Sequence, residues 1–187
     1  LLIATITNGR FTPNQEKTLA MMVKTLPLTL ELDSNQSIDE YMDYINSQWL
    51  DVLTNSSYPL TRISDEFDIT PEILYAYHGK IIQDIYMDGM TLKRVAIGDS
   101  GVKFKITLNV EEVDDAYSIN CEYNDQLYSD EYINTLLDSM RIVLEKFRKY
   151  DKDTQLKEIS ITQEGNWLPN DLELYDIGEK RVNKIFE

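Results

Sequence analysis

The feature that most constrains this chain is a stretch of strict alternation in its first quarter. Every second residue from Leu26 to Leu32 is a leucine, and Thr29 and Glu31 lie between them. A period of two over this length indicates a half-buried β-strand. Pro27 has no backbone N–H to give to a sheet, so it belongs at the start of the strand or on an edge strand.

Other segments carry equally simple periodicities. The apolar run 1–7 is typical of a buried strand, and Ser37 with Glu40 forms a capping-box pattern that starts a helix reaching about Thr54. The remaining patterns predict a short helix or turn up to Phe67, strands over 73–77, 103–110 and 117–123, a hairpin within 81–95 around Asp88-Gly89, a loop over 97–101, and a helix over 129–150. This order predicts an α+β fold with a mixed, mostly antiparallel sheet and helices on one face.

Composition narrows the class of protein. The 187 residues contain 42% hydrophobic residues, 10% aromatic residues and twelve tyrosines, which indicates a globular chain with one core. The net charge of −15 excludes a phosphate-binding surface of the kind that nucleic acids need, and it disfavours anionic membranes. We therefore expect no nucleic-acid partner and no membrane partner.

Candidate reactive groups are few. Cys121 is the single cysteine, so an internal disulfide is excluded, and its place on an alternating apolar strand indicates a buried, unreactive thiol. Acidic pairs such as Asp114-Asp115 lack the spacing and partners of a metal site, so we expect no metal. The first residues lack the basic segment of a signal peptide. A strand that opens at residue 1 favours a fragment of a longer chain, and a single cysteine fits a reducing cytoplasm.

Five motifs, in order, resemble the condensation domains of non-ribosomal peptide synthetases. Residues 19–32 are similar to that family's "GMFVNTLPLR" motif, and 55–60 to its "HQDYPF" motif. Residues 68–77 are placed like the "FDVMFVYQN" strand, 102–108 resemble "KFDLTL", and 121–128 resemble "YNTDLF". Apolar positions are kept while polar ones differ. Lys24 stands where the family has Asn, Thr29 where it has Arg, Lys105 where it has Asp, and residues 55–57 replace the His-Gln-Asp triplet.

The resemblance implies a fold and a place in a larger enzyme. It implies that residues 1–161 are the C-terminal lobe of a condensation domain, with a chloramphenicol-acetyltransferase-like fold, truncated at its N-terminal side. Residues 162–187 resemble a linker and the start of a following adenylation domain. The implied partners are the N-terminal lobe, peptidyl carrier proteins with their phosphopantetheine arms, and that adenylation domain, in secondary-metabolite and antibiotic biosynthesis. No bound cofactor is implied.

The implied reaction joins a carrier-bound acyl donor to a carrier-bound amino acceptor through an amide bond. The family's "HHxxxDG" motif lies on the other lobe, and this chain has one histidine, His78, at the end of a predicted strand. We therefore expect no catalytic residue here and no activity of the chain alone. Lys24, Thr25 and His78 are the candidate channel-lining residues, although a solvent-exposed Lys24 and a structural His78 remain open.

Two other functions remain open at this point. Loss of polar motif residues is also expected of a non-catalytic, condensation-like docking domain that binds carrier or tailoring proteins. An epimerisation domain of the same superfamily is the third alternative, since residues 71–79 faintly resemble that subfamily's "FNYLG".

Overall fold

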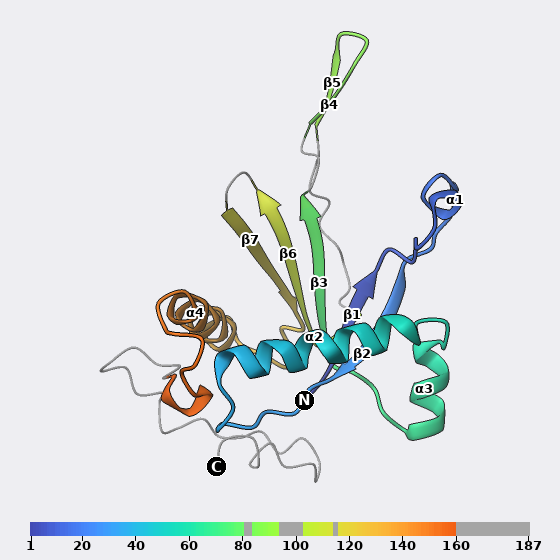
Figure 1. The fold of residues 1–187 in the computed structure, drawn as a ribbon. Coiled ribbons are helices and arrows are strands. Elements are labelled where there is room, and N and C mark those ends of the chain that lie inside the picture. The colour runs from blue at the N-terminus through green and yellow to red at the C-terminus, as the bar shows by residue number, and fades with distance from the viewer. Residues whose placement is uncertain (81–83, 94–102, 114–115, 160–187) are drawn as a thin grey trace.

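The computed structural model describes residues 1–80, 84–93, 103–113 and 116–159 (Figure 1). A five-stranded sheet has the order β2-β1-β3-β6-β7, and a separate hairpin pairs β4 with β5. The strands are β1 (Leu2–Thr7), β2 (Lys24–Thr29), β3 (Ile73–Lys80), β4 (Asp84–Met87), β5 (Met90–Lys93), β6 (Ile106–Val113) and β7 (Ala116–Tyr123). The helices are α1 (Pro13–Glu16), α2 (Ile38–Thr54), α3 (Leu60–Phe67), α4 (Asp130–Phe147) and a 3-10 turn, Leu156–Glu158.

The sheet is mixed, as the sequence predicts. Its centre is parallel, because β3 pairs in parallel with both β1 and β6. Its margins are antiparallel, because β2 pairs with β1 and β7 pairs with β6 in hairpin-like fashion. The α+β class expected from the order of elements is confirmed.

Pro27 lies in the edge strand β2, opposite Ala4 of β1. An edge strand is paired on one side only, so a residue without an N–H is tolerated there. The strand nevertheless begins three residues before Pro27 and ends at Thr29. Leu32, expected in the same strand, is 64% exposed, so the leucine alternation extends further than the strand does.

Helices α2 and α4 pack on one side of the sheet, here called the helix face. Leu26 and Leu28 of β2 are buried on this side, and α2 crosses in front of the strands in Figure 1. Ile106 and Leu108 of β6 and Ile133 of α4 form the buried cluster between the sheet and this helix. Residues opposite each other in neighbouring strands share a face, which places the other alternating set of side chains on the opposite side, here called the open face.

Both long helices begin as the sequence predicts. Ser37 and Glu40 form a capping box at α2, in which Glu40 accepts from the Ser37 N–H at 2.9 Å and Ser37 accepts from the Glu40 N–H at 3.2 Å. Ser129 caps α4 by accepting from the Tyr132 N–H. Leu144 of α4 is 53% exposed, whereas Leu136, Leu137 and Met140 of the same helix pack against the cluster of Ile133.

Two hairpins refine the sequence reading. Asp88 and Gly89 both have positive φ, 47° and 77°, which suits the two-residue turn predicted between β4 and β5. Strands β6 and β7 pair as far as Val113 and Ala116, so this hairpin is tighter than the predicted connection of 111–116. The predicted loop at 97–101 and the segment 162–187 lie outside the described residues.

Residues 8–23 between β1 and β2 contain α1, which the alternation pattern did not predict. Thr12 caps it and Pro13 occupies its first turn, a combination typical of a helix start. The Arg10 guanidinium donates to the backbone carbonyls of Gln15, Thr18 and Ala20, the last two at 2.8 Å. These three hydrogen bonds connect the start of the segment 8–23 to its second half.

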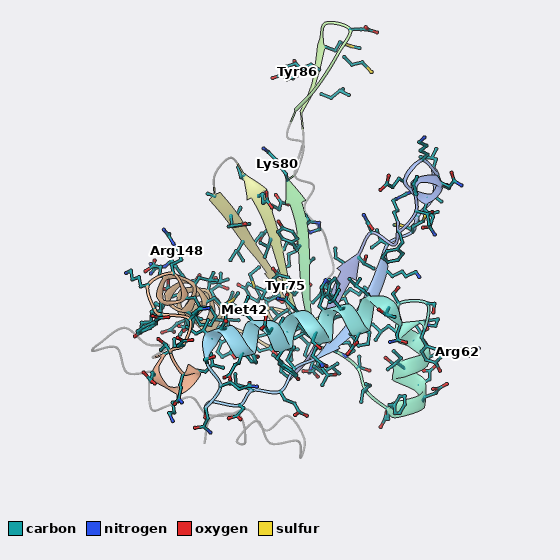
Figure 2. All side chains as sticks on the ribbon, in the orientation of Figure 1. Met42, Arg62, Tyr75, Lys80, Tyr86 and Arg148 are labelled. Carbon is teal, nitrogen blue, oxygen red and sulfur yellow. The ribbon has the colours of Figure 1, made fainter. Side chains whose placement is uncertain are left out.

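The β4–β5 hairpin is an exposed apolar arm. Figure 2 shows Tyr86 on this hairpin, well away from Tyr75 on the sheet. Tyr86 is 76% exposed, and Met87, Met90 and Leu92 are each at least half exposed. Among the described residues, no helix combines the length and the apolar character needed to cross a membrane.

Candidate functional site

The structure places Lys24 on the helix face. Lys24 lies two residues before Leu26 in an uninterrupted β2 ladder, so both side chains point to the same side. Its ammonium group donates to the backbone carbonyl of Ser56 at 3.0 Å, just beyond the end of α2. The half-buried cation therefore has a backbone carbonyl as its partner.

Thr25 and His78 lie on the open face, in strands that β1 separates. Thr25 is opposite Ile6 of β1, and the β1–β3 register places Ile6 on the same side as Ala76, two residues before His78. A register shift between Tyr77 and Gly79 leaves His78 as the extra residue of a bulge. Bulges often re-aim a side chain at a strand end, and here the imidazole is directed to β6.

A row of hydrogen bonds crosses three strands on this face. His78 Nε2 lies 3.1 Å from Asn109 Oδ1, and Asn109 Nδ2 donates to Glu122 Oε1 at 3.2 Å. The three residues come from β3, β6 and β7. His78 and Glu122 are exposed and Asn109 is half-buried, so the row is open at both ends.

The middle of the open face is lined by small side chains. Ala4 is 0% and Ala76 is 2% exposed, and Thr107 is buried beside them. At the opposite strand ends, Lys105 forms an ion pair with Glu72 at 2.5 Å. Lys105 thus has an acidic partner at the position where the resembled family has a carboxylate.

The helix face carries two tyrosines, Tyr75 and Tyr77, in β3, the strand that also carries His78. The Tyr77 hydroxyl donates to Glu112, and this hydrogen bond, with smaller contributions from desolvation and neighbouring charge, raises the pKa of Tyr77 to about 12. Burial, followed by the nearby Tyr117, raises the pKa of Tyr75. Both hydroxyls stay protonated at neutral pH, and the hydroxyl of Tyr77 is a hydrogen-bond donor.

Cys121 packs on the helix face against the α4 cluster. Burial, together with the charge of Glu122, raises the pKa of the Cys121 thiol. A protonated thiol is a poor nucleophile, which fits the unreactive cysteine predicted from the sequence. Within the described residues, no group of three or more His, Cys, Asp or Glu side chains could hold a metal ion.

Sequence reasoning selected His78 but missed Asn109 and Glu122. Both are polar residues in the alternating segments of β6 and β7, facing away from the apolar set. That alternation could have placed them on one face. The contact of Asn109 with His78, however, depends on the parallel register of β3 and β6, which the sequence does not specify.

Comparison with known proteins identifies the family. The family model described as "Condensation domain" matches residues 1–166. Bacitracin synthase 1 of Bacillus licheniformis is 20% identical over 88% of this chain, and surfactin synthase subunit 1 of Bacillus subtilis is 21% identical over 78% of it.

Solved structures show the same fold. A four-domain nonribosomal peptide synthetase bound to AMP and glycine superposes with a TM-score of 0.77 over 88% of this chain, at 16% identity. The first condensation domain of the CDA synthetase superposes with a TM-score of 0.67 over 86% of it, at 15% identity.

The matches cover only part of each relative. The chain spans 3% of bacitracin synthase 1, 4% of surfactin synthase subunit 1, 14% of the four-domain synthetase and 37% of the CDA condensation-domain chain. The motifs, the mixed sheet and the family match nevertheless agree over most of the described residues. The chain belongs to the condensation-domain family.

Proposed function

We propose that this chain is the C-terminal lobe of a non-ribosomal peptide synthetase condensation domain that forms amide bonds. The observation that carries the proposal is the asymmetry of the sheet. One side is covered by α2 and α4, while the opposite side presents Thr25 and the His78–Asn109–Glu122 row. The middle of this second face is buried, but it carries exposed polar side chains, His78 and Glu122, at neighbouring strand positions. Such an exposed polar row can contribute to one wall of a substrate channel.

The proposed role of this wall is orientation. Holding two reactants in the geometry of attack accounts for a large part of a bimolecular barrier. Thr25 and His78 contribute side chains to the wall. Lys24 contributes from the helix face, by fixing the start of β2 against the end of α2. The donor and the acceptor arrive on the phosphopantetheine arms of peptidyl carrier proteins in the cytoplasm.

The proposed structural partner is the N-terminal lobe of the same condensation domain. The β4–β5 arm supports this proposal, because Tyr86, Met87, Met90 and Leu92 expose apolar surface on a narrow hairpin. Contiguous exposed apolar surface of this kind marks interaction sites. Residues 162–187, with the adjacent adenylation domain as their partner, remain a proposal from sequence.

Binding of the two lobes tests the partner. We expect the chain to self-associate in light scattering, or to form a complex with a separately expressed N-terminal lobe. Replacing Met87 and Met90 by lysine should weaken this association, whereas replacing Met42, an exposed methionine on α2 (labelled in Figure 2), should not. A strictly monomeric chain that does not bind the lobe would contradict the proposed partner.

Product formation tests the function. Donor-loaded and acceptor-loaded carrier proteins are supplied to the chain alone and to the complete condensation domain that contains it, and transfer is followed by mass spectrometry. We expect amide product only from the complete domain. Transfer by the chain alone would overturn the division of labour between lobes. Carrier binding without transfer by the complete domain would favour a docking domain instead.

A further inference from the structure

The hydrogen bonds of the Glu122–Asn109–His78 row determine which nitrogen of the His78 imidazole carries the proton on the open face. We propose that His78 binds the amino group of the acceptor substrate through Nδ1, with Asn109 and Glu122 as positioning residues that hold the imidazole in the required tautomer. The proposal rests on the proposed function, because it names the substrate group that the channel wall contacts.

The first step concerns the amide of Asn109. An ionised carboxylate only accepts hydrogen bonds, so Glu122 Oε1 must face the NH₂ group of Asn109. The 3.2 Å contact from Asn109 Nδ2 satisfies this requirement. The carboxylate thereby sets the orientation of the amide, and Asn109 Oδ1 is turned toward β3.

The second step concerns the imidazole. Asn109 Oδ1 is an acceptor, so the His78 Nε2 atom that lies 3.1 Å from it must carry the proton. In a neutral imidazole the other nitrogen then has a free lone pair. Within the described part of the chain, Nδ1 has no hydrogen-bond partner, and the side chain is exposed. Nδ1 is therefore available as an acceptor for a ligand N–H.

Charge on the same face favours a ligand with N–H donors and positive charge. The Glu122 carboxylate lies on the side of the sheet that carries Asn109, because it accepts a hydrogen bond from the Asn109 amide. Lys105 lies at the other end of β6 and is paired with Glu72. An amino group that binds Nδ1 thus approaches a region of negative potential, as electrostatic complementarity requires.

The tautomer can be measured directly, since His78 is the single histidine of the chain. With ¹⁵N-labelled histidine, and at a pH where imidazole is neutral, we expect a protonated Nε2 and an unprotonated Nδ1 with well-separated shifts. Asn109→Leu and Glu122→Leu should both move the two shifts toward each other, although Glu122 does not touch His78, because each removes a member of the row. Asn120→Leu, on the strand position opposite Asn109, is the control and should leave them in place.

A protonated Nδ1 in the wild-type chain would overturn the proposal. Shifts that Asn109→Leu and Glu122→Leu leave unchanged would overturn it equally, because the row would then not control the imidazole. The NMR shifts do not depend on activity. They therefore test the hydrogen-bonded row independently of the proposed function.

Substrate contact is tested in the complete condensation domain with an aminoacyl-pantetheine thioester as the acceptor probe. We expect His78→Phe to raise KM for this probe on the order of tenfold, the effect of one lost hydrogen bond, while KM for the donor stays unchanged. His78→Gln should restore acceptor binding, because its amide can donate to Asn109 and present an oxygen as acceptor.

An active domain in which His78→Phe leaves the acceptor KM unchanged would overturn the inference alone. A wild-type domain that forms no amide would overturn the proposed function, and the assignment of the substrate group with it. The two failures are therefore distinguishable.

Discussion

The ammonium group of Lys24 donates a hydrogen bond to the backbone carbonyl of Ser56, 3.0 Å away, and so connects the start of β2 to the end of α2. Helix α2 has no basic residue in its last turn. Carbonyl groups at a helix C-terminus carry partial negative charge and favour a nearby cation. Lys24 supplies that cation from a strand 32 residues earlier in the chain.

Lys24→Met should therefore lower the stability of the fold. We expect a loss of about 1 kcal/mol in the free energy of unfolding, measured by urea denaturation, because a charged hydrogen bond and a helix-end interaction are lost together. Lys17→Met, at an exposed lysine after α1, is the matched control and should change little. Unchanged stability with altered acceptor use in the complete domain would instead support a channel-lining Lys24.

Gly9 and Gly79 form a natural pair for separating backbone strain from steric clash. Both have positive φ, 66° and 65°. A Cβ at Gly9 would lie 2.0 Å from the Met22 carbonyl oxygen, whereas a Cβ at Gly79 would meet nothing within 4 Å. Gly79→Ala should cost about 1 kcal/mol from its left-handed backbone alone. Gly9→Ala should cost at least about 2 kcal/mol more, since backbone must move. Equal losses of unfolding free energy for the two variants in urea denaturation would contradict this prediction. The segment 8–23 would then accommodate the added Cβ without an energetic penalty.

The sequence predicted the secondary structure well where the interactions that fix it are local in the chain. The capping box at Ser37, the apolar stripe of α4 and the Asp88-Gly89 turn each depend on residues close in the chain. The resemblance to the condensation-domain family was also confirmed. It was carried by short motifs whose apolar positions this chain keeps. The ends of elements were less predictable. Leu32 is 64% exposed, because the leucine alternation continues beyond the end of β2.

The polar contacts of the candidate site could not be predicted in the same way. The bond from Lys24 to Ser56 joins residues 32 apart, and that between His78 and Asn109 joins residues 31 apart. The contact of Lys24 depends on how the end of α2 packs against β2. The contact of His78 depends on the parallel register of β3 and β6, which are joined by a crossover connection. A shift by one residue would turn every side chain to the other face, so neither contact follows from composition or spacing.

Cys121 should react slowly with alkylating reagents in the folded chain. Burial, and then the charge of Glu122, raises the pKa of its thiol, so the reactive thiolate is scarce at neutral pH. We expect iodoacetamide modification, followed by mass spectrometry, to be much slower in buffer than in urea. Glu122→Gln should accelerate the native reaction slightly, while Glu131→Gln on α4 should not. Equal rates in buffer and urea would mean that the strand does not protect the thiol.

The hydrogen bond between Tyr77 and Glu112 should make one tyrosine ionise late. It raises the pKa of Tyr77 from 10.0 to about 12 in the folded state, with desolvation and nearby charges adding to it. A group whose pKa is higher in the folded than in the unfolded state stabilises the fold fully below the unfolded value. That contribution is lost as the pH rises from 10.0 through about 12. Tyrosinate absorbance should show a last step near the upper value that is absent in Tyr77→Phe.

Glu112→Gln should move this step toward the ordinary tyrosine range, because the charged acceptor is the largest cause of the shift. Glu131→Gln, an exposed carboxylate change away from β3, should leave the step in place. If Tyr77→Phe removed a step near the ordinary tyrosine pKa instead, Glu112 would not be its partner in solution. The β3–β6 register next to His78 would then need revision, because Tyr77 is paired with Val110 in the ladder that also sets Ala76 opposite Asn109.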